Sequence, residues 1–299
     1  MEYINVNNLT KDYGQGRGIF DFNFNIKKGE VHAIVGQNGS GKTTTLRLFM
    51  GFLKPDNGDV TINGLDSWNE SQDIKRIVSY VPGEINFPDV GSGETFLDIL
   101  KGYYGIKDST YMNKLIDLFK LDARVPLRRM SKGMKQKAAL VAAFMKDADI
   151  ILLDEPSTGL DPLMRDNLIE LINQEKKRGK TIVMSSHIFT EIEQTSDRVT
   201  FINNGKLIET IDLHELLDSN VKEYKVSFES NDESIKFVQT TKLNIDKIEI
   251  DSVSVMVSLE EINSFFDELS NYKIKTIEYK PYTLEKYYEQ EILGGIQNE

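Results

Sequence analysis

The chain has 299 residues and a net charge of −11, and it contains no cysteine. It therefore needs neither disulfides nor a thiolate zinc site, which suits a reducing compartment. The acidic balance argues against binding nucleic acid through phosphate neutralisation. No apolar run approaches the roughly 20 residues that span a bilayer. The start, Met1 to Asn5, does not resemble a secretory signal, so we expect a water-soluble chain of one large and one smaller domain.

The first 65 residues are predicted to be rich in strands. Four apolar residues alternate with polar ones from Phe20 to Ile26, which is the period of a half-buried strand. A continuous apolar run over 31–35 predicts a buried strand, and residues 44–52 predict a helix. Pro55 and Gly58 mark a turn before a short strand over 60–62, which ends in Asn63-Gly64.

The residues between the buried strand and the helix fit a phosphate-binding loop, G-x-x-x-x-G-K-T. Its glycines let backbone N–H groups turn around phosphate oxygens, and the following helix points its positive end there. We expect Lys42 to reach the β- and γ-phosphates and the Thr43 hydroxyl to ligate Mg²⁺. The residues expected to contact the nucleotide here are Gly36, Asn38, Gly39, Ser40, Gly41, Lys42, Thr43 and Thr44. Such a pattern also occurs by chance in ordinary loops, but the flanking strand and helix favour the phosphate site.

The middle of the chain changes from strands to helices and back. From Phe96 to Met145 the apolar residues follow helical spacing, which predicts a helical insertion. Strand-like runs return at 150–153, 181–185 and 199–202, with an amphipathic helix over 163–177. Strands that alternate with helices predict a mostly parallel sheet.

Two of these strands end in residues that could carry chemistry. Asp154 and Glu155 follow a buried run, and ligands bind at the carboxyl ends of strands in open parallel sheets. We expect Asp154 to help hold Mg²⁺ and Glu155 to polarise the water that attacks the γ-phosphate. His187 ends the next strand, where it could contact the γ-phosphate and orient Glu155 and water. Alone, the acidic pair could cap a surface turn and the histidine could be structural.

A second pattern begins near Ser219. Strands are predicted around 224–228, in two runs over 248–257, and around 274–277, with helices over 234–239 and 262–269. A terminal helix is expected from about Thr283. The order β-α-β-β-α-β predicts a small split β-α-β domain.

With these motifs, residues 2–215 closely resemble the nucleotide-binding subunits of ABC transporters. The resemblance implies a P-loop ATPase of α/β class: a mostly parallel sheet, an antiparallel β subdomain and a helical subdomain at about 85–147. We place the ATP-binding domain at 1–218 and, from the β-α-β-β-α-β order, a ferredoxin-like α+β domain at 219–299. Lys42, Glu155 and His187 would be catalytic, and ATP and Mg²⁺ the cofactors. Tyr13 matches the aromatic that stacks on adenine, although a half-buried strand-end tyrosine is the ordinary alternative.

The resemblance also implies a dimer. Met130 to Met134, M-S-K-G-M, resembles the family's L-S-G-G-Q signature, which acts on the ATP held by the opposite subunit. Ser131 and Gly133 would supply the hydroxyl and N–H, with Asp161 in the adjoining D-loop. Lys132 departs from the pattern, and it is either a charge near phosphate or a solvated side chain.

A larger departure lies at Gly83, where the family has a glutamine that senses Mg²⁺ and links to the membrane partner. The adjacent Glu84 could replace it, because a carboxylate is a good ligand for a hard cation. The alternative is that Glu84 is an ordinary acidic loop residue.

The signature and the C-terminal extension resemble those of ABC-2-type exporters, in particular Gram-positive subunits that export antimicrobial or toxic peptides. This implies a separate polytopic permease, a homodimer or heterodimer with another ATPase subunit, no nucleic-acid partner, and a peripheral position at the cytoplasmic face of the membrane. The extension would be a dimerisation or stability module, or a regulator that gates the dimer. The alternative function is a soluble ABC-type ATPase acting on nucleic acid or the ribosome.

Overall fold

The computed structural model describes residues 2–218 and 221–293. The chain divides into two compact units, the first ending at Asp212 and the second beginning at Leu213. The sequence predicted this boundary at 218/219. In the structure it lies six residues earlier, and the short helix α8 (Leu213–Leu217) therefore belongs to the second unit. Within the described residues no helix is both long and apolar enough to cross a membrane.

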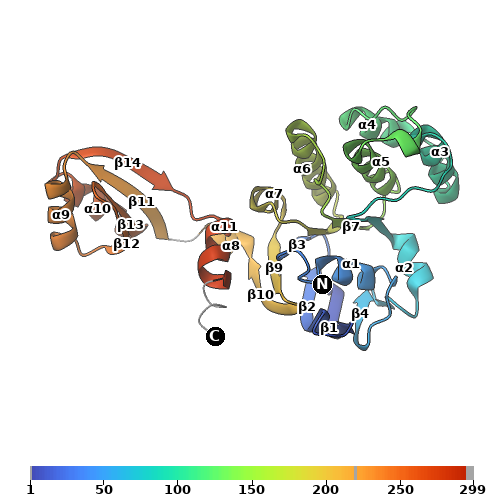
Figure 1. The fold of residues 1–299 in the computed structure, drawn as a ribbon, viewed down its shortest axis with the longest axis horizontal. Helices are drawn as coiled ribbons and strands as arrows, with labels where there is room; N and C mark the ends of the chain where they lie inside the picture. The colour runs from blue at the N-terminus through green and yellow to red at the C-terminus, as the bar shows by residue number, and fades with distance from the viewer. Residues whose placement is uncertain (1, 219–220, 294–299) are drawn as a thin grey trace. The chain divides into compact units, whose positions relative to one another are not determined.

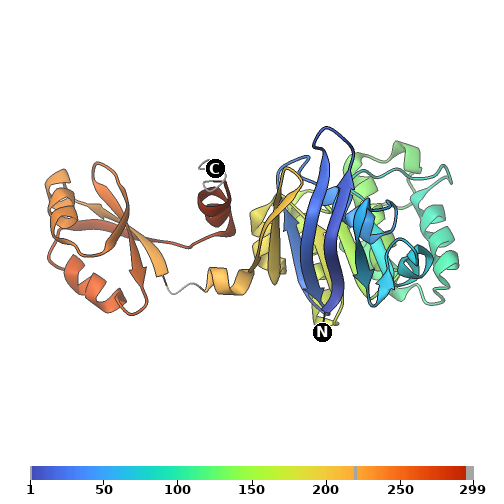
Figure 2. The same ribbon diagram turned by 90° about the horizontal axis from the view of Figure 1, so that it is seen from below.

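Among the described residues, the first unit is built on a ten-stranded sheet in the order β5-β4-β1-β2-β10-β9-β3-β8-β7-β6. The strands are β1 (Glu2–Asp12), β2 (Gly18–Lys27), β3 (Val31–Val35), β4 (Asn57–Ile62), β5 (Leu65–Asp66), β6 (Val78–Val81), β7 (Ile150–Asp154), β8 (Thr181–Ser185), β9 (Arg198–Asn203) and β10 (Lys206–Asp212). The strands β6, β7, β8, β3 and β9 pair in parallel. The strands β1, β2, β4 and β5 pair antiparallel, and Figure 2 shows β1 and β2 in blue as long neighbours. The predicted combination of a parallel core and an antiparallel part is confirmed.

The parallel core brings three strand ends together. Every residue of β3, β7 and β8 is buried, which explains why these strands are mostly apolar. Because these strands are parallel and Ser185 of β8 pairs with both Ile34 and Asp154, their carboxyl ends lie at one edge of the sheet. The helices α1 (Lys42–Phe49), α2 (Ser71–Ile77), α6 (Pro162–Lys177) and α7 (Phe189–Thr195) complete this part of the unit.

Residues 93–144 form the helical insertion that the sequence predicted, shown in green in Figure 1. It consists of α3 (Gly93–Tyr104), α4 (Thr110–Leu118), a 3₁₀ turn (Leu127–Arg129) and α5 (Lys132–Phe144). Two helix starts are capped by serine: Ser92 accepts from the backbone N–H of Thr95, and Ser131 accepts from that of Met134. The second of these caps coincides with the predicted signature.

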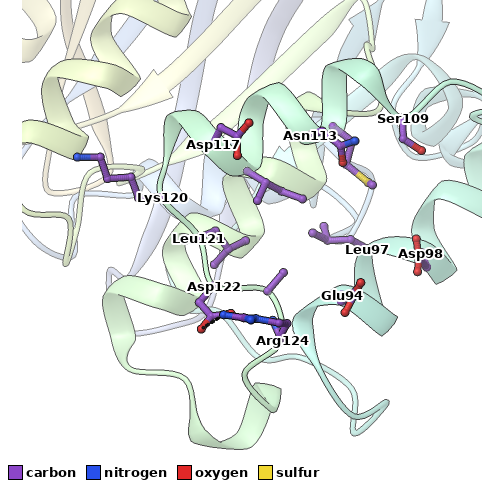
Figure 3. A pocket seen from close by; sticks show the side chains of 13 residues that line it. Glu94, Leu97, Asp98, Ser109, Asn113, Asp117, Lys120, Leu121, Asp122 and Arg124 are labelled. Carbon is purple, nitrogen blue, oxygen red and sulfur yellow. Dashed lines mark hydrogen bonds and ion pairs between the residues drawn. The ribbon is translucent and has the colours of Figure 1, made fainter.

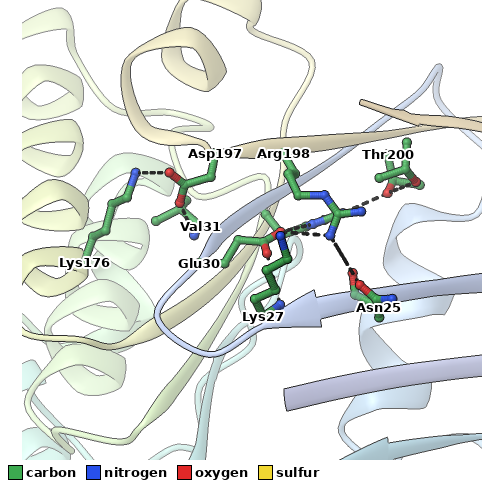
Figure 4. Close-up of polar contacts among 10 residues, drawn as sticks. Asn25, Lys27, Glu30, Val31, Lys176, Asp197, Arg198 and Thr200 are labelled. Carbon is green, nitrogen blue, oxygen red and sulfur yellow. Dashed lines mark hydrogen bonds and ion pairs between the residues drawn. The ribbon is translucent and has the colours of Figure 1, made fainter. Parts of the chain in front are cut away.

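The amino end of β3 holds a buried polar network that the sequence did not reveal (Figure 4). His32 is fully buried, with Nδ1 2.7 Å from Glu30 Oε1 and Nε2 2.8 Å from Thr200 Oγ1. The Arg198 guanidinium lies 3.6 Å from the same Glu30 oxygen and donates to the Asn25 carbonyl at 3.1 Å. Each buried polar group thus has a partner, as burial requires.

The second unit contains an antiparallel sheet in the order β12-β13-β11-β14. Its elements are α8, β11 (Val221–Phe228), α9 (Asn231–Thr240), β12 (Asn244–Ile248), β13 (Ser252–Ser258), α10 (Ile262–Leu269), β14 (Ile274–Lys280), α11 (Leu284–Tyr287) and a π turn (Tyr288–Leu293). Its core is lined by Val226, Phe228, Phe237, Val253, Val255, Val257, Phe265 and Leu269. The β-α-β-β-α-β order from β11 to β14 agrees with the predicted split β-α-β arrangement.

Two details of the second unit bear on the predictions. Ile250 was expected within a strand but lies in the turn between β12 and β13, with 80% of its surface exposed. The Glu249 N–H donates to the Ser252 carbonyl at 2.8 Å and closes that turn, so the apolar alternation is interrupted there. The terminal helix begins where expected, with the Thr283 side chain capping α11.

Candidate functional site

The loop between β3 and α1 can hold its shape only with glycine at certain positions. A Cβ on Gly36 would lie 2.3 Å from the Ile202 carbonyl oxygen of β9, and one on Gly41 would lie 2.4 Å from Ile19. Gly41 also has φ +115°, a conformation that L side chains rarely adopt. The loop is therefore pressed against β9 and β2, with α1 starting at Lys42.

Lys42 is buried and held in place by the loop itself. Its ammonium donates to the Gly36 carbonyl at 2.8 Å and to the Gln37 carbonyl at 3.3 Å. The ammonium also lies 3.4 Å from Glu155 Oε1. A single cation thus connects the loop after β3 with the carboxylate after β7.

Two buried oxygens at this site have no hydrogen-bond partner among the described residues: Ser40 Oγ and Asp154 Oδ2. The other oxygen of Asp154, Oδ1, accepts from Ser185 Oγ at 2.7 Å, so the carboxylate is fixed with one oxygen free. Burying polar atoms without partners is costly, and a phosphate for the serine and a hydrated or direct Mg²⁺ for the carboxylate would satisfy them. The residues present therefore fit both ATP and Mg²⁺.

Glu155 and His187 form the pair that the strand ends predicted. His187 Nδ1 lies 2.6 Å from Glu155 Oε2, and the imidazole is 61% exposed. Glu155 has φ +48°, and its N–H is held by the Ser185 carbonyl at 3.1 Å and the Ser185 hydroxyl at 3.0 Å. A non-glycine residue in the left-handed region is costly, and such strain is concentrated at functional sites.

Lys42 and Glu155 line a pocket of about 280 Å³. It is lined by Tyr13, Arg17, Gly18, Asn38, Gly39, Ser40, Gly41, Lys42, Thr43, Thr44 and Glu155. Tyr13, expected to stack on adenine, is 54% exposed at this pocket. The sequence reasoning missed Arg17, a cation that suits a polyphosphate; its place four residues after Tyr13 was the available signal.

Seven predicted site residues do not line this pocket in their own chain. Gly36, Asp154 and His187 belong to the phosphate loop and the neighbouring strand ends, and Glu84 follows β6. The other three are Ser131, Gly133 and Asp161. They lie together elsewhere, because a Cβ on Gly133 would meet the Gly159 carbonyl at 2.6 Å. Asp161 caps α6 by accepting from the Met164 N–H at 3.0 Å and lies 3.7 Å from the Lys137 ammonium of α5. The signature helix and the segment before α6 thus form one surface.

Gly83 lies beside the carboxylate of Asp154, the predicted Mg²⁺ ligand, since a Cβ on Gly83 would be 3.1 Å from Asp154 Oδ2. Glu84 next to it is exposed and does not line the nucleotide pocket. Tyr80 of β6 is also near Asp154. Burial and the charge of Asp154 raise the pKa of the Tyr80 hydroxyl. The position of the missing glutamine is therefore close to Asp154, while the Glu84 side chain stays a predicted metal ligand.

A second pocket, with a larger volume of about 740 Å³, lies between α3 and α4 in the helical insertion (Figure 3). It contains none of the predicted site residues. Its charged lining has four carboxylates, Glu94, Asp98, Asp117 and Asp122, and two cations, Lys120 and Arg124, so on balance it would repel phosphates. The nucleotide site is therefore the smaller pocket at the strand ends.

Known proteins of one family are similar to this chain in sequence. The ABC transporter family model matches residues 19–158. The bacitracin transport ATP-binding protein BcrA of Bacillus licheniformis is 34% identical over 73% of this chain and 72% of its own length. The chain belongs to the ABC transporter ATP-binding proteins. It is accordingly an ATPase with ATP and Mg²⁺ as cofactors.

Two further comparisons extend the likeness. A solved ATP-binding subunit of an ABC transporter matches with a TM-score of 0.66 and 29% identity, over 72% of this chain and 91% of that one. The uncharacterized ABC transporter ATP-binding protein YcbN of Bacillus subtilis is 28% identical over 93% of this chain and 98% of its own length. The similarity to YcbN therefore extends into the second unit.

Proposed function

We propose that this chain is the ATP-hydrolysing subunit of an exporter for peptides or antimicrobial compounds, bound at the cytoplasmic face of the membrane to a separate polytopic permease. The main support for ATP hydrolysis is that Glu155 contacts both Lys42 and His187, which brings together groups from the ends of β3, β7 and β8. The export of peptides is supported by the similarity to a bacitracin transport protein. The acidic charge argues against the alternative, a soluble ATPase acting on nucleic acid or the ribosome.

In this proposal each residue has a role in phosphoryl transfer, which depends on positioning and charge stabilisation. Lys42 and the loop N–H groups hold the phosphates, and Glu155 accepts a proton from the attacking water while His187 fixes its orientation. Thr43 and Asp154 would hold Mg²⁺, with Glu84 as a further ligand. When bound, Mg²⁺ neutralises charge on the phosphate oxygens.

The site is proposed to be completed by a second ATPase subunit, identical or different. Ser131 and Gly133 lie at the start of α5, where the helix presents its positive end, yet they do not line their own nucleotide pocket. Facing a partner's ATP, they would contact its γ-phosphate, with Asp161 on the same surface.

The proposed docking place for the permease is an apolar groove of about 260 Å³ beside the segment that follows β6. The rings of Phe87 and Phe96 lie 4.7 Å apart there, and Leu100 and Tyr104 of α3 continue the lining. Because Gly83 lies beside Asp154 at the start of this segment, a partner in the groove could sense the nucleotide site.

The ATPase roles are tested by Glu155→Gln. We expect ATP binding to persist and turnover to fall by about 10²-fold or more, the contribution of a general base. The variant should also accumulate as an ATP-bound dimer, measured by light scattering beside phosphate release. Glu94→Gln, outside the site on α3, is the matched control. Turnover at the wild-type rate in Glu155→Gln would remove Glu155 from the mechanism.

The permease is tested by co-purification from solubilised membranes. The full chain should bring a polytopic membrane protein with it, and Leu100→Glu should lose that protein while it still binds ATP. If nothing membrane-embedded associates with the wild-type chain, the exporter proposal is wrong although the ATPase remains.

A further inference from the structure

A buried carboxylate outside the proposed mechanism lies directly behind the catalytic pair. Glu191 is on α7 and only 3% exposed. Its Oε2 accepts from Ser157 Oγ at 2.9 Å and from Ser186 Oγ at 3.3 Å. Its other oxygen, Oε1, forms an ion pair with Arg165, whose Nε lies 3.0 Å away, but the two atoms do not have hydrogen-bond geometry. Burial raises the pKa of Glu191, while these partners favour its charged form.

The two serines belong to the two loops that carry the catalytic pair. Ser157 follows Glu155 by two residues and begins the segment that leads to Asp161. Ser186 directly precedes His187, and its hydroxyl also accepts from the Ile188 N–H at 3.0 Å. One carboxylate therefore joins the loop after β7 to the loop after β8.

The third partner extends this connection to the surface proposed to meet the partner subunit. Arg165 is on α6, in the turn that follows the Asp161 cap, and its N–H donates to the Asp161 carbonyl at 3.0 Å. Its side chain is 36% exposed, so it lies between solvent and the buried carboxylate. A displacement of the segment 157–161 therefore either breaks the hydrogen bond between Ser157 and Glu191 or moves Glu191 and with it the contact to Ser186.

We propose that Glu191 is a positioning residue that couples the segment Ser157–Asp161 to His187, so that subunit contact on this segment sets the alignment of the His187–Glu155 pair. This inference rests on the proposed function, because it assigns a regulator to the same site. Neither Glu191 nor its two serines line the nucleotide pocket, so the coupling acts on turnover and not on ATP affinity.

The first test separates turnover from binding. Glu191→Gln keeps the shape of the side chain but loses the charge that faces Arg165. We expect kcat of the full chain to fall by about tenfold or more, as for a lost positioning group, with the ATP dissociation constant within about twofold. The matched control is Glu175→Gln: Glu175 is also 3% exposed and paired with an arginine, Arg178, but lies on α6 away from the pocket. Glu175→Gln should lower thermal stability and leave kcat unchanged.

The second test does not depend on turnover. The chain has three histidines, so the imidazole signals can be assigned by NMR after selective ¹³C labelling. Ser157→Ala, on the opposite loop, should shift the His187 signal and leave that of His32 unchanged, and this shift should be absent when Glu191→Gln is already present.

Three outcomes would overturn the coupling: a kcat of Glu191→Gln within twofold of wild type, a loss of ATP binding equal to the loss of turnover, or a His187 signal that ignores Ser157→Ala. Absence of Mg²⁺-dependent ATP hydrolysis in the wild-type chain would instead contradict the proposed function, and the NMR test would still decide the coupling.

Discussion

At the amino end of β3, the buried side chain of His32 makes the stability of the fold depend on pH. His32 is fully buried, and this burial lowers its pKa more than the neighbouring Glu30 raises it. The neutral imidazole can donate from Nδ1 to Glu30 and accept at Nε2 from Thr200, which uses both ring nitrogens. Protonation would place a second proton where the threonine hydroxyl donates, so the folded state resists it.

The sign of the effect follows from the two pKa values. The unfolded histidine titrates near its ordinary pKa of about 6.5, and the folded one titrates lower. The stabilisation is therefore complete above about pH 6.5 and is lost as the pH falls through the folded pKa. We expect the free energy of unfolding to be lower at about pH 5 than at about pH 7.5, and His32→Gln to reduce that difference. Denaturant titrations at the two pH values measure this difference for the wild type and the variant.

The sequence predicted those site residues that belong to a short, recognisable sequence motif. Asp154 ends β7, Glu155 and His187 lie just after β7 and β8, and Lys42 follows the loop after β3. The parallel register brings these strand ends to one edge. Arg17 and Glu191 do not belong to a recognisable motif. Their proposed roles depend on contacts with residues that only the fold brings close. The buried His32 was missed for the same reason, because its partners Glu30 and Thr200 belong to different parts of the chain.

At the scale of elements, the segment after β6 departs most from the family pattern. Gly83 removes a side chain beside Asp154 Oδ2, and Glu84 is the adjacent carboxylate. We expect Glu84→Gln to raise the Mg²⁺ concentration for half-maximal ATPase activity about tenfold, the size of effect typical of a lost outer metal partner. Asp89→Asn in the same segment, near Arg128, is the control. An unchanged Mg²⁺ dependence would make Glu84 an ordinary loop residue.

The elements themselves were predicted with unequal success, for a physical reason. The buried strands β3, β7 and β8 are mostly apolar and were located nearly to the residue. The turn at Ile250 was misread because an exposed isoleucine continues the apolar alternation of its neighbours. Only the hydrogen bond from Glu249 to Ser252, a contact of the folded hairpin, marks the turn.

At the scale of the whole molecule, the arrangement predicts that an active site needs two chains. A Lys42→Ala subunit should fail to bind its own ATP, and a Ser131→Arg subunit should fail to complete the partner's site. Each variant alone should be inactive, whereas an equal mixture should regain about a quarter of wild-type activity if the sites act independently and subunits exchange at random. If Ser131 acted within its own chain, the mixture would stay inactive. Phosphate release from the mixed and separate proteins decides between the two.

The strand order also has a consequence during synthesis. The strand β3, which leads into the phosphate loop, pairs with β8 and β9 and not with a neighbour in sequence. On a ribosome that adds about 5–20 residues per second, β3 must wait on the order of 10 s before β8, which begins at Thr181, has been made. During that interval an apolar strand has no lateral partner, so a nascent chain of this protein is expected to depend on chaperones until β9 emerges.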